Sequence, residues 1–122
     1  MIEQTLYSLL SSSAVITAIT PRIYPLVLPQ STVLPAIDYR IVASTAKATF
    51  DTSGTLRFRV EVNSWATQYA DAWTLRDAVI STLNRWSDGS TSIQFLMSQD
   101  FFDHELLQCR CATEFYVYTT GF

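Results

Sequence analysis

Residues 22–29 read RIYPLVLP, and residues 34–39 read LPAIDY. A proline fixes its own φ angle, has no N–H to donate, and biases the residue before it toward extended backbone. The three prolines of this span therefore exclude a helix between residues 21 and 36. We expect the chain to cross the span as extended backbone at the edge of a sheet.

Before this span, apolar residues recur at helical spacing. The positions Ile2, Leu6 and Leu10 predict an amphipathic helix over residues 2–12, with its apolar side toward a core. Ser13 has the side chain of an N-cap and predicts a second, short helix that ends near Ile19.

After the span, alternation of apolar and polar residues predicts strands. One strand is expected over residues 36–46 and another from Leu56 onward, joined as a hairpin through the turn-rich residues 50–55. The second strand would place Leu56, Phe58, Val60 and Val62 on one face and Arg57, Arg59, Glu61 and Asn63 on the other. A slip of one residue would bury the charges, so one face of the sheet is expected to be apolar and the other polar. Trp65 has the same spacing as the polar residues of this strand, so either a bulge redirects it or its indole lies on the polar face.

The longest helix is predicted over residues 68–86, with Thr67 as its N-cap. Its apolar stripe consists of Ala72, Leu75, Val79, Leu83 and Trp86. Tyr69, Trp73 and Ile80 lie partly off this stripe, so the helix is either deeply buried or meets another chain along its flank.

A Gly-containing turn at residues 87–90 then leads to two more strands, near 92–101 and 107–118. Two main helices and at least four strands predict an α+β fold, a two-layer sandwich with an antiparallel sheet. The length of 122 residues predicts a single domain, 1–122.

The composition favours a protein that contacts other proteins. The net charge is −3 and the pI about 4.9, which disfavours binding to nucleic acid. Charged residues make up 16% of the chain, below the typical value of about 25%, while 48% are hydrophobic and 13% aromatic. Such surfaces are typical of large protein–protein contacts. A slightly apolar monomer is the alternative.

The sequence has neither the basic start of a signal peptide nor an apolar run of membrane-spanning length, so we expect a cytoplasmic protein with no membrane partner.

No constellation of catalytic, cofactor-binding or metal-ligating residues is found in the sequence. The single histidine, His104, lies in a polar segment between two predicted strands. Cys109 and Cys111 are expected to be buried, reduced thiols on one strand face, because two such ligands alone make no zinc site. The three glycines lie far apart and cannot form a phosphate-binding loop. We therefore expect no enzyme, no cofactor and no metal.

The pattern of a short helix, RIYPLVLPQ, LPAIDY, and a strand that ends in Trp-Ala before an Ala-rich helix resembles one family. The family comprises the small tail-completion proteins of long-tailed bacteriophages, also called tail terminators or tail-to-head joining proteins. The resemblance extends from Met1 to about Phe115. It implies a subunit of a ring, usually of six copies, at the head-proximal end of the tail tube in the virion.

The resemblance also implies the partners. These are further copies of the chain, the tail tube protein, and the connector or head-completion proteins, while DNA passes through the bore without specific binding. Assembly would take place in the cytoplasm of a bacterial host. The alternatives are another neck protein, such as a head-completion adaptor, or a small cytoplasmic ligand-binding or enzyme domain.

Candidate residues for a subunit or partner interface are outward, charged or aromatic positions. The predicted hairpin tip, residues 46–55, is expected either to reach a neighbouring subunit or tube protein or to be a surface loop. The full candidate set is Arg40, Phe50, Asp51, Arg57, Arg59, Glu61, Trp65, Trp73, Arg110, Glu114 and Tyr116.

Overall fold

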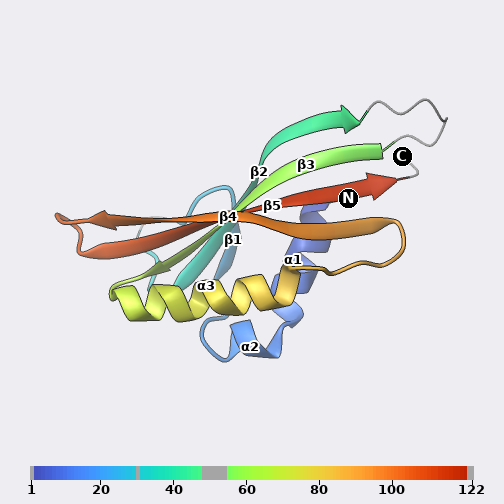
Figure 1. The fold of residues 1–122 in the computed structure, drawn as a ribbon. Helices are drawn as coiled ribbons and strands as arrows, with labels where there is room; N and C mark the ends of the chain where they lie inside the picture. The colour runs from blue at the N-terminus through green and yellow to red at the C-terminus, as the bar shows by residue number, and fades with distance from the viewer. Residues whose placement is uncertain (1, 30, 48–54, 121–122) are drawn as a thin grey trace.

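The computed structural model describes residues 2–29, 31–47 and 55–120 of the chain. Three helices and five strands follow one another in these residues (Figure 1). In chain order they are α1 (Ile2–Ser12), α2 (Ala14–Thr17), β1 (Ile23–Pro25), β2 (Ala36–Lys47), β3 (Thr55–Ala66), α3 (Tyr69–Leu83), β4 (Thr91–Asp103) and β5 (Gln108–Thr120).

The five strands form one sheet in the order β1-β2-β3-β5-β4. The pairs β2–β3, β3–β5 and β5–β4 are antiparallel, as the sequence predicts. The pair β1–β2 is parallel, with Ile23 opposite Ile37, and is the exception to the predicted all-antiparallel sheet. It is parallel because residues 26–35 loop back to the starting end of β1 before β2 begins. The proline-rich span is thus an edge strand followed by a loop.

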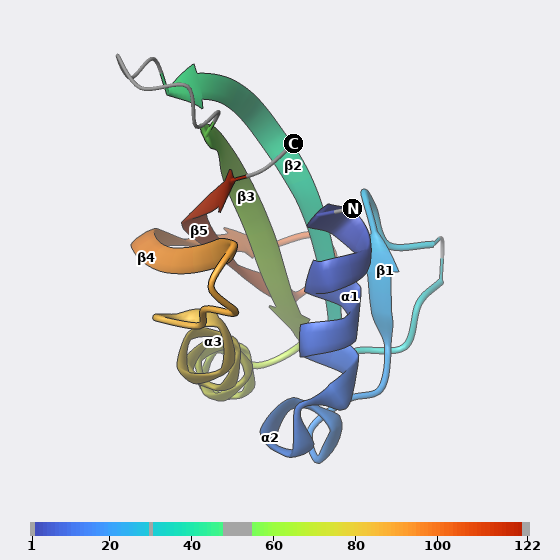
Figure 2. The ribbon, with the colours of Figure 1, turned by 90° about the vertical axis from the view of Figure 1, so that its right-hand side faces the viewer.

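The helices cover one face of the sheet, and the other face has no helix on it (Figures 1 and 2). Between the layers lies a core of buried side chains from every strand and all three helices. Its largest fully buried members are Phe115, Leu6, Leu10, Ile16, Ile37, Leu75, Leu83, Val60, Val62, Val79 and Val117. The predicted two-layer α+β fold with two main helices is confirmed. None of the described helices is long and apolar enough to cross a bilayer.

The N-terminal helices follow the predicted pattern. Leu6 and Leu10 of α1 are fully buried. Ser13 is the N-cap of α2, and its Oγ accepts a hydrogen bond from the backbone N–H of Ile16 at 3.3 Å. The same oxygen lies 2.9 Å from Oγ1 of Thr82, so this cap also connects α2 to α3.

Helix α3 begins and ends differently from the prediction. Its N-cap is Gln68, with no side-chain capping bond, rather than Thr67. The helix stops at Leu83 because Asn84 has an extended ψ of 128° and Arg85 a positive φ of 67°. Asn84 Oδ1 instead accepts the backbone N–H of Phe95 in β4, at 3.0 Å. Trp86 therefore packs against the core from beyond the helix, not as part of its stripe.

The last two strands form a long hairpin whose tip extends past the beginning of α3 (Figure 1). Residues 104–107 form the turn, and Leu107 has a positive φ of 53°. His104 is exposed there, with its ring edge-on to Phe102 at 4.6 Å between ring centres. Nearer the core, Cys109 and Cys111 are buried free thiols, as predicted.

Candidate protein interface on the sheet

The face of the sheet without helices, here called the outer face, brings together eight of the eleven predicted interface residues. The pairing of Arg40 with Glu61, of Arg59 with Tyr116 and of Trp65 with Arg110 places them on shared rungs. The eight residues are Arg40, Arg57, Arg59, Glu61, Trp65, Arg110, Glu114 and Tyr116. Those on β3 face outward because side chains alternate along a strand, and β3 buries Val60 and Val62 on its other side.

Ion pairs join the strands across this face. Arg59 donates two hydrogen bonds to Glu114, from Nε to Oε1 and from Nη2 to Oε2, both at 2.9 Å. This two-pronged geometry fixes the orientation of the guanidinium group. Glu61 lies between two more arginines, 3.4 Å from Arg40 and 3.9 Å from Arg110. The predicted charged row is therefore a connected network, although exposed pairs of this kind contribute little to stability.

Aromatic rings on the outer face are covered by arginines. The Arg57 guanidinium lies 4.6 Å from the centre of the Tyr116 ring. Arg110 lies 4.3 Å from the Phe101 ring centre and 5.6 Å from that of Trp65. Stacked arginines and aromatic side chains are the residues that dominate binding energy in protein interfaces.

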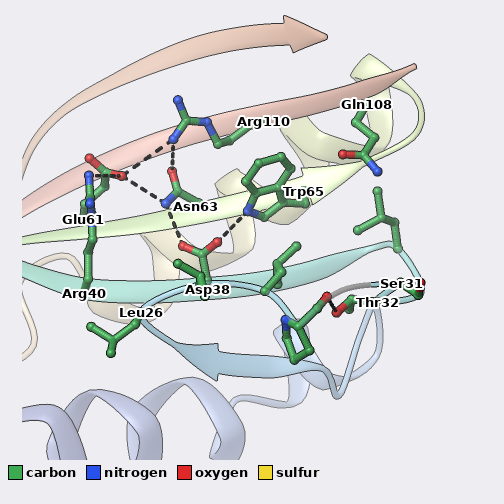
Figure 3. Close-up of a pocket in the computed structure, with 14 residues that line it drawn as sticks. Leu26, Ser31, Thr32, Asp38, Arg40, Glu61, Asn63, Trp65, Gln108 and Arg110 are labelled. Carbon is green, nitrogen blue, oxygen red and sulfur yellow. Dashed lines mark hydrogen bonds and ion pairs between the residues drawn. The ribbon is translucent and has the colours of Figure 1, made fainter. Parts of the chain in front are cut away.

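Asp38 is a buried carboxylate on this face, and the sequence analysis did not select it. It is 3% exposed, although its position in β2 alternates with apolar neighbours as an outward residue does. Trp65 Nε1 donates to its Oδ2 at 2.7 Å, and Asn63 Nδ2 donates to its Oδ1 at 2.7 Å (Figure 3). Trp65 is thus on the outer face without a redirecting bulge, held there by Asp38.

Burial raises the pKa of Asp38, and the hydrogen bonds from Asn63 and Trp65 oppose this rise only in part. Because the pKa is higher in the folded than in the unfolded chain, folding favours the protonated form. The contribution of this group to stability is therefore greatest at low pH and is lost as the pH rises through the folded pKa.

An Asp38→Asn variant tests the raised pKa of Asp38, because asparagine has the same size and no charge. From about pH 4, where aspartates ordinarily titrate, to about pH 7, the wild-type free energy of unfolding should fall relative to that of the variant. Urea unfolding at several pH values measures the difference. Parallel curves for the two proteins would contradict the assigned pKa direction.

Asp38 is covered by the loop between β1 and β2, which folds over the outer face. The loop and the strands enclose a groove of about 440 Å³ (Figure 3). Leu26, Pro29 and Leu34 line it on the loop side, and Trp65 and Arg110 on the strand side. The lining is mixed, with apolar side chains mostly on the loop side and arginine, glutamine, asparagine and carboxylate groups on the strand side.

The other three predicted interface residues do not belong to this face. Trp73 is on α3, 39% exposed, and its ring lies 5.3 Å from that of Tyr69. The Tyr69 hydroxyl and Trp73 Nε1 both donate to Asp100 Oδ2, at 2.6 and 3.2 Å. These aromatics therefore attach the helix to the β4–β5 hairpin. Phe50 and Asp51, and most of the predicted hairpin tip, lie outside the described residues.

The arrangement on the outer face is suited to protein contact. Its four arginines pair with Glu61 or Glu114 or stack on aromatic rings, Asp38 is held by Asn63 and Trp65, and no nucleophile lies beside a base among them. Among the described residues, no three His, Cys, Asp or Glu side chains are grouped so as to hold a metal ion. Fold and site together define a small α+β domain whose outer face is suited to contact with other proteins.

The family model for "Tail completion protein gp17" matches residues 4–118, and the chain belongs to this family. It is therefore a structural tail completion protein and not an enzyme. Among solved structures, it is similar to a chain of the virion of a native gene transfer agent particle, with a TM-score of 0.70 and 19% sequence identity. The match covers 95% of this chain and 92% of that chain, and at this identity it establishes the fold. No curated protein sequence matches this chain.

Proposed function

We propose that copies of this chain close into a ring, of six subunits, that caps the head-proximal end of a phage tail tube and joins the tail to the head. Membership of the tail completion family carries this proposal. The likeness of the fold to a chain of a virion supports it.

The surface supports assembly around an axis. The described chain leaves thirteen large hydrophobic side chains at least 36% exposed, including Leu26, Val27, Leu106 and Leu107. Few charged residues are available to keep such a surface soluble, since they make up 16% of the chain. One interface repeated head to tail closes into a ring and covers apolar surface on every copy.

The charge distribution supports a division of roles between the surfaces. A ring of six copies would carry about −18 in total, since each chain has a net charge of −3. DNA would then slide through the bore without being held. The outer face has the opposite character, with four arginines against three carboxylates, and arginines that faced DNA would bind its phosphates. We therefore assign the outer face to protein partners: the tube protein, the head connector or a neighbouring subunit.

The test combines native mass with imaging. Native mass spectrometry of the purified protein, alone and with tube protein of the same phage, should give six copies. Negative-stain images should show a ring at one end of each tube, and tubes assembled without the protein should be longer. Twelve copies would favour a head-completion adaptor instead. Tubes of equal length with no ring at either end would overturn the proposal.

A further inference from the structure

Two apolar patches lie at opposite edges of the sheet and at the same end of it. The loop patch, beside β1, consists of Leu26, Val27 and Val33, which are 67%, 72% and 65% exposed. The tip patch, on the β4–β5 hairpin, consists of Phe101, Phe102, Leu106 and Leu107, which are 45%, 47%, 65% and 64% exposed. Apolar side chains that are exposed together in this way indicate a binding partner.

The loop patch is held in a fixed shape. Arg22 Nε donates to the carbonyl oxygens of Val33 and Pro35, at 2.8 and 3.2 Å. The backbone N–H of Leu26 donates to Tyr39 O at 2.8 Å, and Leu26 has a positive φ of 70°. A non-glycine residue in this conformation is maintained only where its surroundings impose it, and such residues gather at functional sites. Leucine 26 is thus held outward, in a strained conformation, on a preformed surface.

The groove beside the loop patch has the size and lining to receive the tip patch of another molecule. Its volume of about 440 Å³ falls in the range of sites that enclose a compact group. Leu26, Pro29, Leu34 and Trp65 give it apolar walls. The tip presents the matching shape, because Leu106 and Leu107 stand at the narrow end of a two-stranded hairpin.

The charges around the two surfaces are complementary. The hairpin tip carries the exposed carboxylates Asp103 and Glu105. The groove is lined by Arg40, whose side chain is 49% exposed, and by Arg110, and these two share Glu61 as their ion-pair partner. Glu61 and the buried Asp38 also line the groove, so Arg40, the more exposed of the two arginines, is the cation best placed to meet a carboxylate of the tip. Opposite charges of this kind fix the register of an interface and accelerate association.

We infer that the tip patch of one copy binds in the groove beside the loop patch of the next copy. Leu106 and Leu107 enter the groove, and Asp103 and Glu105 face Arg40 and Arg110. Because the two surfaces are different, the contact is heterologous, and such a contact repeated from copy to copy forms a ring where the rotation between copies closes. This inference rests on the proposed ring and identifies the interface between its subunits.

A double variant, Leu106→Asp with Leu107→Asp, tests this contact, because it replaces the apolar side chains at the end of the tip with charged ones. Its matched control is Tyr7→Asp with Val15→Asp, on the exposed sides of α1 and α2. The tip variant should be monomeric by native mass and should leave tubes without rings, while its circular dichroism and Tm match those of the control. The control should form the wild-type ring.

Cysteine cross-linking tests the pairing directly. An equimolar mixture of Val33→Cys and Leu106→Cys proteins should give disulfide-linked dimers that contain one copy of each variant. Each variant alone should give none, since the native thiols are buried. Dimers from Leu106→Cys alone would overturn the inference in favour of a tip-to-tip contact.

The outcomes separate the interface from the ring. Intact rings in the tip variant would overturn this interface and leave the proposed function standing. A wild-type protein that is monomeric in solution and absent as a ring from tubes would overturn the proposed function itself.

Discussion

A Phe115→Ala variant is expected to lose about 3–5 kcal/mol of unfolding free energy. Phe115 lies at the centre of the core, fully buried, with its ring edge-on to Phe95 at 5.9 Å between ring centres. Removing it deletes a buried aromatic ring and leaves a cavity that the surrounding strands and helices fill only in part. Small domains have about 5–15 kcal/mol of stability in total, so the variant should be unfolded or close to it at 37 °C. Urea denaturation followed by tryptophan fluorescence measures the loss.

Phe102→Ala is the matched control, since it makes the same change on the neighbouring strand at a side chain that is 47% exposed. Its unfolding free energy should stay within about 0.5 kcal/mol of the wild-type value. Equal losses in the two variants would mean that the hairpin tip belongs to the core of the monomer. That result would contradict the division between core and tip described above.

The second large effect is expected at the outer face. Arg57→Glu reverses a charge on β3 and removes the cation stacked over Tyr116. If this face binds a tube or head protein, a like-charge contact costs several kcal/mol, and each 1.4 kcal/mol is a factor of about ten in affinity. We therefore expect the fraction of capped or head-joined tails to fall at least about tenfold, with the fold and the ring intact. Counting tails in negative-stain images gives the fraction.

Arg85→Glu is the control for this experiment. It makes the same change in net charge at an exposed residue in the turn after α3, away from the outer face. It should leave capping at the wild-type level. A similar fall in both variants would trace the effect to overall charge, and no fall in either would remove the outer face from the proposed interface.

The two-layer fold was predictable because its strongest signals are local. In β3, valines alternate with arginines and Glu61. Only one register of the strand buries the valines and leaves the charged side chains exposed. The proline span likewise excluded a helix and led to an edge strand. The eight outer-face residues followed from the same alternation, so sequence alone gave most of the candidate interface.

The remaining features depend on contacts between distant residues. Register shifts at residues 41–43 of β2 and 95–97 of β4 arise where neighbouring strands bend, and no local pattern marks them. The burial of Asp38 was not predicted, because alternation identifies its face but not the loop that covers it. Helix α3 ends early because Asn84 binds the backbone of Phe95, eleven residues away. The groove is missed for the same reason, since its walls come from four separate segments.

The buried thiols have a consequence for a particle that leaves the cell in which it was built. Burial, together with a hydrogen bond to Asp100, raises the pKa of Cys111 to about 12. The thiolate is the form that reacts with oxidants, so at neutral pH almost none of this sulfur is reactive. In aerated surroundings, Cys111 therefore forms no cross-links.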